Sequence, residues 1–119
     1  VVDQEWVQTS LARLTAKARF LELLNWKVAS IVSKGALNPA DASALKVHGS
    51  EFFIETYRAL MEVIGSGSVL RKDSPAAALA GDLERWMRAA LVLTFGGGTN
   101  EIQRDIIAMV GLDMPRAPR

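Results

Sequence analysis

Apolar residues recur along the first part of the chain at steps of three, four and seven, the spacing that marks one face of an α-helix. The pattern runs over residues 3 to 34 and consists of Val7, Leu11, Leu14, Ala18, Leu21, Val28 and Val32. It predicts one long amphipathic helix. No run of residues alternates apolar and polar positions as a strand does, so we expect an all-α fold.

The rest of the chain divides into further helices at glycine, proline and capping residues. Lys34-Gly35 predicts the end of the first helix, and Asn38-Pro39 predicts an N-cap followed by proline at the first helical position. Four helices with short links predict an antiparallel four-helix bundle. The expected elements after the first helix are a helix over 39–64, a loop over 65–78 with one helical turn, a helix over 79–94, a turn over 95–100, a helix ending at Gly111 and a tail over 113–119.

The second of these helices carries two adjacent apolar lines, so its buried face should be wide and should touch other helices on both sides. One line is Phe53, Tyr57, Leu60 and Ile64, and the other is Leu45, Phe52, Ala59 and Val63.

Composition restricts the class of protein. A length of 119 residues suits a single domain over residues 1–119, and the 50% of hydrophobic residues suits a packed core. The formal net charge is +1 with no basic stripe, which argues against nucleic acid as a partner. Cysteine is absent, and the apolar runs are too short to cross a membrane. We expect a soluble, cytoplasmic protein with no metal site.

The most informative segment is the stretch from Gly96 to Arg104, in which three glycines lead into a capped helix. We call residues 95–100 the glycine turn. Glycine lets a ligand approach the backbone closely, and the N–H groups at a helix start favour an anion such as a pyrophosphate. The alternative is that the glycines only reverse the chain and that Thr99 or Asn100 only caps the helix.

Gly-Gly-Thr-Asn-Glu-Ile-Gln-Arg, followed by Asp-Ile-Ile-Ala, resembles the end of acyl-CoA dehydrogenases. The resemblance continues through Arg85-Trp86-Met87-Arg88 and 62–67 and covers essentially the whole chain. It implies the C-terminal four-helix domain of that family, which packs against the same domain of other subunits and closes over FAD. The implied reaction is α,β-dehydrogenation of an acyl-CoA thioester, part of fatty acid and lipid metabolism.

The family's cofactor contacts carry over to particular positions. Thr99, Asn100 and Glu101 match residues that contact the phosphate and ribose region of FAD. Glu62 and Gly65 match a Gln-x-x-Gly stretch that reaches FAD across a subunit interface. Glu62 replaces the usual glutamine, and a carboxylate can accept hydrogen bonds but not donate them. A solvent-exposed helix charge is the alternative for Glu62.

Many members of the family place the catalytic glutamate directly before the Gly-Thr pair of this turn. Gly97 occupies that position and cannot accept a proton. Three explanations stay open. The base can lie on an earlier helix, as in the long-chain and isovaleryl branches. The chain can be the base-free subunit of a heteromeric dehydrogenase. It can also have different flavin chemistry or act as a binding module without turnover.

The resemblance further implies that Gly97 and Gly98 form a small part of the substrate wall. The family's N-terminal helical domain and middle β-domain have no counterpart in this sequence. We therefore expect a domain of a longer polypeptide that forms a homo-oligomer, or a hetero-oligomer with another acyl-CoA dehydrogenase subunit, and that is inactive alone. A purely structural association module is the non-enzymatic alternative.

The remaining chemical side chains are expected to be structural. His48 should be a surface or interface residue. Arg88 and Arg104 can be interface or cofactor arginines, and the alternative is that Arg104 with Asp105, like Asp82 with Arg85, forms an exposed ion pair of little energetic weight.

Overall fold

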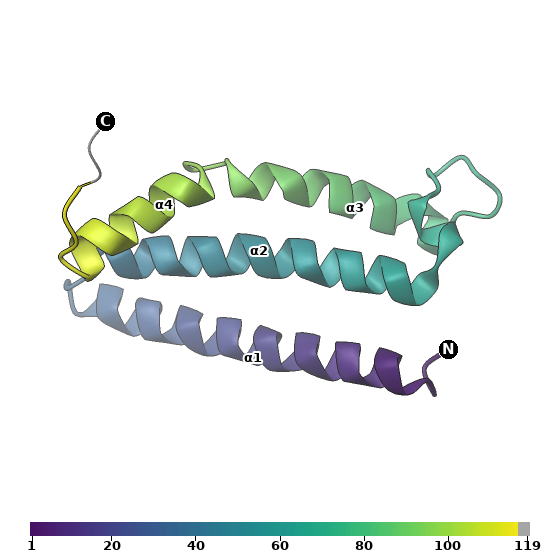
Figure 1. The fold of residues 1–119 in the computed structure, drawn as a ribbon, viewed down its shortest axis with the longest axis horizontal. Coiled ribbons are helices and arrows are strands. Elements are labelled where there is room, and N and C mark those ends of the chain that lie inside the picture. The colour runs from purple at the N-terminus through teal and green to yellow at the C-terminus, as the bar shows by residue number, and fades with distance from the viewer. Residues whose placement is uncertain (117–119) are drawn as a thin grey trace.

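The computed structural model describes residues 1–116, and all of its regular elements are helices (Figure 1). The predicted all-α class is therefore confirmed for this part of the chain. The last residues of the predicted tail, 117–119, lie outside the described residues. The α-helices are α1 (Glu5–Ser33), α2 (Pro39–Ile64), α3 (Asp82–Ala90) and α4 (Asn100–Ile106); the shorter helices are η1 (Ser66–Val69), η2 (Ala78–Gly81), η3 (Leu91–Thr94) and the π-helical η4 (Ile107–Gly111).

The α1–α2 hairpin forms where the sequence predicts it. Gly35 has a φ of 69° and donates its N–H to the Val32 carbonyl at 2.9 Å, which ends α1. The Asn38 side chain accepts a hydrogen bond from the Ala40 N–H at 2.8 Å, which caps α2. Both bounds of α1 lie within two residues of the prediction, and those of α2 coincide with it.

Helix α2 lies in the middle of the molecule, with α1 on one side and α3 followed by α4 on the other (Figure 1). The four α-helices thus make an open array of three antiparallel rows. The radius of gyration is 17.7 Å, whereas a compact domain of this length has one of about 13 to 14 Å. The accessible surface is 8229 Å², against about 6,300 Å² for a compact monomer of this mass.

The core of this open array is thin. The wide apolar face predicted for α2 does contact helices on both sides, but Phe53 and Ile64 stay 43% and 39% exposed. The outer side of α1 exposes Leu23 and Trp26, each at 67%. The buried apolar residues are Val7, Leu14, Val28, Ala40, Val47, Ile54, Leu83 and Ala90.

The predicted start of the third helix is wrong by three residues. Leu79 and Ala80 adopt left-handed conformations with φ of 50° and 52°, so α3 begins only at Asp82. Gly81 follows with a φ of 77°, and a Cβ placed on it would lie 2.4 Å from the Lys72 backbone nitrogen, so the chain packs closely against itself just before α3. The last residues of the predicted helix form the 3-10 segment η3, which is wound more tightly than an α-helix.

No helix within residues 1–116 combines the length and the apolar character that a membrane span needs.

Candidate functional site

The glycine turn links the α3 row to α4 and leaves its backbone open. Gly97 and Gly98 have φ of 72° and 95°, a region that side-chain-bearing residues avoid. A Cβ placed on Gly97 would meet no atom within 4 Å. The main chain at Gly97 can therefore be approached directly by a ligand.

Of the two residues that the sequence offers as a cap, Thr99 and Asn100, it is Thr99 that caps α4. Its backbone is extended, and its hydroxyl accepts a hydrogen bond from the Ile102 N–H at 3.3 Å. The Gln103 side chain turns back and donates to the Gly97 carbonyl at 3.1 Å. The first turn of α4 and the glycines before it thus form one hydrogen-bonded unit.

Two polar residues of α2, Lys46 and Ser50, hold this hydrogen-bonded unit in place. The Lys46 ammonium donates to the Gly98 carbonyl at 2.7 Å and to Asn100 Oδ1 at 2.6 Å, with Thr94 O at 3.3 Å. The Asn100 amide nitrogen donates to Ser50 Oγ at 3.0 Å. Asn100 and Ser50 are both 5% exposed. The Asn100 side chain therefore faces α2 and is fully engaged within the chain.

Glu101 stands exposed in the first turn of α4, where a carboxylate is stabilised. The hydrogen bond from its own backbone N–H lowers the pKa of its carboxyl, and the Thr99 hydroxyl and the charges of Arg104 and Lys46 act in the same direction. Glu101 is thus an ionised acceptor at neutral pH. Of the two interpretations open for Arg104, the ion pair with Asp105 does not form, because Arg104 binds Glu51 of α2.

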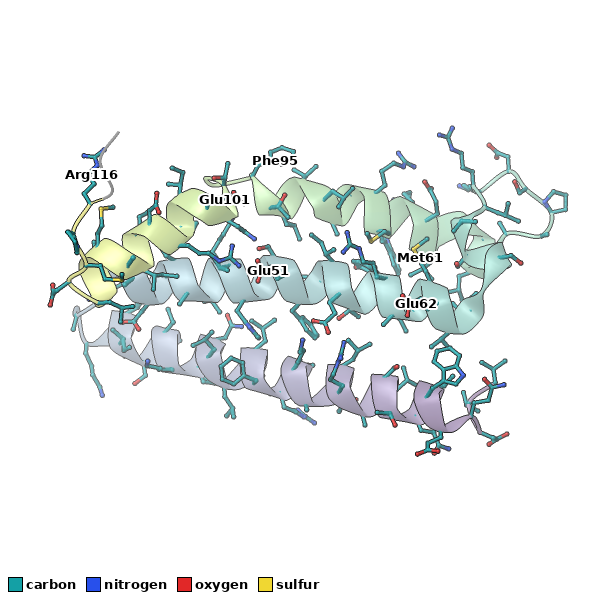
Figure 2. The ribbon with its side chains drawn as sticks, in the orientation of Figure 1. Glu51, Met61, Glu62, Phe95, Glu101 and Arg116 are labelled. Atoms are coloured by element: carbon teal, nitrogen blue, oxygen red, sulfur yellow. The ribbon has the colours of Figure 1, made fainter. Side chains whose placement is uncertain are left out.

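Glu62 and Gly65 lie at the other end of α2 and both are exposed. Figure 2 shows Glu62 displaced along α2 from Glu101, which projects from α4. Twelve residues separate Ser50, the support of the glycine turn, from Glu62, which is about 18 Å at the helical rise. The structure therefore does not bring the two predicted groups of cofactor residues together within one chain.

The two broad faces of the array differ in chemistry. A groove of about 350 Å³ beside the glycine turn is largely apolar, with Lys46 and Ser50 at its polar end. A second groove of about 440 Å³ is lined mainly by charged side chains. Phe53 lines the first groove and Glu62 lines the second. Nine residues separate them along α2, which corresponds to two and a half helical turns, so the two side chains project from opposite sides of the helix. The apolar groove is lined by Leu21, Asn25, Leu45, Lys46, Gly49, Ser50, Phe53, Leu93 and Gly96.

The other chemical residues take structural positions. Arg85 donates to Asp82 at 3.1 Å, as predicted for an exposed pair. His48 is half-buried and meets the ring of Phe20 edge-on, with centroids 4.8 Å apart. Its Nε2 is buried without a hydrogen-bond partner in the described part of the chain. Residues 1–116 hold no group of three or more His, Cys, Asp or Glu side chains arranged for a metal ion.

Sequence reasoning from the residues missed Lys46, Ser50 and Gln103, which hold the glycine turn. Lys46 and Ser50 are one helical turn apart on α2 and follow Leu45 and Gly49 along its apolar side. This pair of polar residues beside an apolar line of α2 is the sequence pattern that could have identified Lys46 and Ser50. Its partner, Asn100, lies fifty residues away from Ser50 and cannot be identified from spacing.

An open helical array with an exposed glycine turn at the start of a capped helix defines an all-helical domain with a large accessible surface. Residues 1–112 match the family model of the acyl-CoA dehydrogenase C-terminal domain. The chain belongs to this family.

Individual proteins and solved structures that are similar to this chain belong to the same family. Acyl-CoA dehydrogenase FadE26 of Mycobacterium tuberculosis is 57% identical, over 100% of this chain and 30% of its own length. The crystal structure of the ChsE4-ChsE5 complex from M. tuberculosis matches with a TM-score of 0.88 and 59% identity, over 98% of this chain and 30% of that chain. The Tcur3481-Tcur3483 steroid ACAD matches with a TM-score of 0.91 and 44% identity, over the same shares. The chain thus spans about 30% of the relatives it matches.

Proposed function

We propose that this chain is the FAD-contacting and oligomerisation domain of an acyl-CoA dehydrogenase that desaturates an acyl-CoA thioester. The observation that carries the proposal is the glycine turn, open at Gly97 and capped by Thr99, in a chain of this family. FAD would supply the redox chemistry by accepting the β-hydrogen as hydride. The chain itself would bind and orient the cofactor.

The groups at the turn fit a nucleotide cofactor. Glu101 is ionised and exposed, so it suits the hydroxyls of a ribose as a hydrogen-bond acceptor. Thr99 is exposed, and Asn100 would contribute indirectly, because its buried side chain holds α4 on α2. Glu62 and Gly65, displaced along α2, would serve the cofactor of a neighbouring subunit.

Residues of the glycine turn cannot remove the α-proton of a substrate. Gly97 has no side chain, and a carboxylate at Glu101 with a lowered pKa is a weak base. We infer that the base lies elsewhere in the assembly, while Gly97 and Gly98 line the substrate. Two of the similar structures, ChsE4-ChsE5 and Tcur3481-Tcur3483, are named for two different proteins each, and the second is a steroid ACAD. These relatives support a hetero-oligomer with a second acyl-CoA dehydrogenase subunit, acting on a steroid-derived acyl-CoA.

Native mass spectrometry followed by denaturing mass spectrometry of the purified protein tests the assembly. We expect a second polypeptide and a mass matching FAD to travel with this chain. A second observation, the large exposed surface of the open array, favours a purely structural association module, and that reading predicts partners without flavin.

Mutation of the turn separates these two functions. We expect Thr99→Ala combined with Glu101→Ala to reduce flavin retention by the assembled protein about tenfold, because hydrogen bonds to a charged group are lost. The matched control, Thr15→Ala with Glu22→Ala, changes the same residue types on the exposed side of α1. Equal flavin retention in the two variants would refute the cofactor site and favour the association module.

A further inference from the structure

We propose that Lys46 is a positioning residue whose ammonium fixes the glycine turn in the conformation that presents Thr99 and Glu101 to the cofactor. The proposal rests on the proposed function, because it assigns the role to the same turn. It adds a residue of α2 that no cofactor contact of the family suggested.

Every N–H donor of the Lys46 ammonium has a hydrogen-bond acceptor. Its three N–H donors face Thr94 O at 3.3 Å, Gly98 O at 2.7 Å and Asn100 Oδ1 at 2.6 Å. These acceptors come from before, within and after the run of glycines. One side chain of α2 therefore joins both ends of the turn.

The turn needs such a support because its own residues specify its shape weakly. Gly97 and Gly98 have positive φ, and glycine gains more conformational freedom than any other residue when it is released. Within the turn, the bond from Gln103 to the Gly97 carbonyl is a local restraint. Three oxygens that converge on one point repel one another unless a cation lies between them, so removal of the ammonium leaves unpaired acceptors as well as lost bonds.

Asn100 transmits this restraint to α4. An ammonium cannot accept a hydrogen bond, so the Asn100 oxygen faces Lys46 and its amide nitrogen faces Ser50 Oγ at 3.0 Å. The Ser50 hydroxyl then donates to the Val47 carbonyl at 3.1 Å. Since Asn100 is the residue between Thr99 and Glu101, its buried side chain sets the direction in which both neighbours point.

The charge of Lys46 also reaches the exposed side of the turn. It is one of the groups that lower the pKa of the Glu101 carboxyl, after the hydrogen bonds of that carboxyl and the charge of Arg104. Its stem lines the apolar groove next to Gly96. Lys46 thus lies between the groove and the turn without itself occupying the open side of Gly97.

The test uses the complete FAD-bearing assembly and three variants. Lys46→Met keeps the length of the side chain but removes all three donors. Lys46→Arg restores a cation, and Lys27→Met is the matched control, because Lys27 pairs with Asp41 at 3.6 Å and is 61% exposed. The release of FAD is followed by flavin fluorescence, and helix content by circular dichroism.

We expect Lys46→Met to weaken FAD retention about tenfold with helix content unchanged, Lys46→Arg to recover most of that loss, and Lys27→Met to have no effect. If Lys46→Met retains FAD as the parent does while the Thr99 and Glu101 variants lose it, the role of Lys46 is refuted and the proposed function stands. If none of these variants loses FAD, the proposed function fails as well.

Two further outcomes are decisive. If both Lys46 variants fold and arginine recovers nothing, a cation is not what the turn requires, and the proposal is overturned. If Lys46→Met does not fold, Lys46→Gln replaces it, because a side-chain amide keeps a hydrogen-bond donor but carries no positive charge. Lys46→Gln should weaken FAD retention about threefold, and unchanged retention would overturn the proposal.

Discussion

Two glycine-containing connections of this chain differ in how much space surrounds their backbone. At one end of α2, residues 65–81 form a closed corner, where a Cβ on Gly81 would lie 2.4 Å from the Lys72 backbone nitrogen. In the glycine turn, a Cβ on Gly97 would meet nothing within 4 Å. Both glycines have positive φ, at 77° and 72°.

The hydrogen bonds that hold the two connections in place also differ. The corner is held mainly through one of its own residues: Ser68 is 1% exposed, and its hydroxyl lies 2.6 Å from the Gly65 carbonyl and 3.1 Å from the Met61 carbonyl in the last turn of α2. The glycine turn is held from α2 by Lys46, which leaves its outer side open. A glycine of the first kind serves packing inside the chain, whereas one of the second kind leaves the backbone accessible to something outside it.

Gly81→Ala should have the largest effect, because the new methyl group combines an unfavourable φ with a collision against backbone that cannot move aside. We expect the free energy of unfolding to fall by about 3 kcal/mol or more, measured by urea denaturation with circular dichroism. Gly49→Ala is the matched control. It lies within α2, where its Cβ would make an ordinary contact with Leu21 at 3.8 Å, and it should stabilise the chain by about 0.5 kcal/mol. A similar loss in both variants would contradict the packing role of Gly81.

Gly97→Ala should have a smaller effect, because only the backbone conformation opposes it. We expect a loss of about 1 kcal/mol, measured in the same way. A loss as large as that of Gly81→Ala would mean that the turn is closed by contacts within the chain, and the contrast between the two connections would disappear.

The smallest effect should be on the acid side of the pH profile. The pKa of Glu101 in the folded chain lies below the ordinary value of 4.5, so Glu101 contributes stability that is present above the unfolded pKa and is lost as the pH falls through the folded pKa. Titration followed by NMR should give Glu101 a midpoint below 4.5, and Thr99→Val should raise it. An unshifted midpoint in both proteins would show that the Thr99 hydroxyl does not act on this carboxyl.

The sequence predicted those parts of the fold that depend on local signals. Asn38 and Pro39 determine the start of α2 through capping, and Gly35 determines the end of α1, so both were predictable. The left-handed Leu79 and Ala80 were not, because neither residue type favours positive φ, and the close approach of the neighbouring Gly81 to the Lys72 backbone has no local sequence pattern. The π-helical end of the last helix likewise has no local signal that we recognise.

The candidate site divides in the same way. Thr99 was predictable as a cap, since its side chain bonds to a backbone N–H three residues on. The inward direction of Asn100 was not, because it depends on Lys46 and Ser50 of another helix. The functions proposed for Thr99, Asn100, Glu101, Glu62 and Gly65 remain proposals that the flavin retention experiments address.

The open array also has a dynamic consequence. Among the described elements, α2 lies between α1 and the α3–α4 row, so its amides are shielded on two sides, while α1 rests mainly on a single neighbour. In amide hydrogen exchange, α1 should therefore open in smaller local events and lose its protection first, and α2 should keep its protons longest. Contact with further subunits would slow exchange at the outer edge of α1, where Leu23 and Trp26 are exposed, and would convert the most labile row of the isolated chain into an interior one.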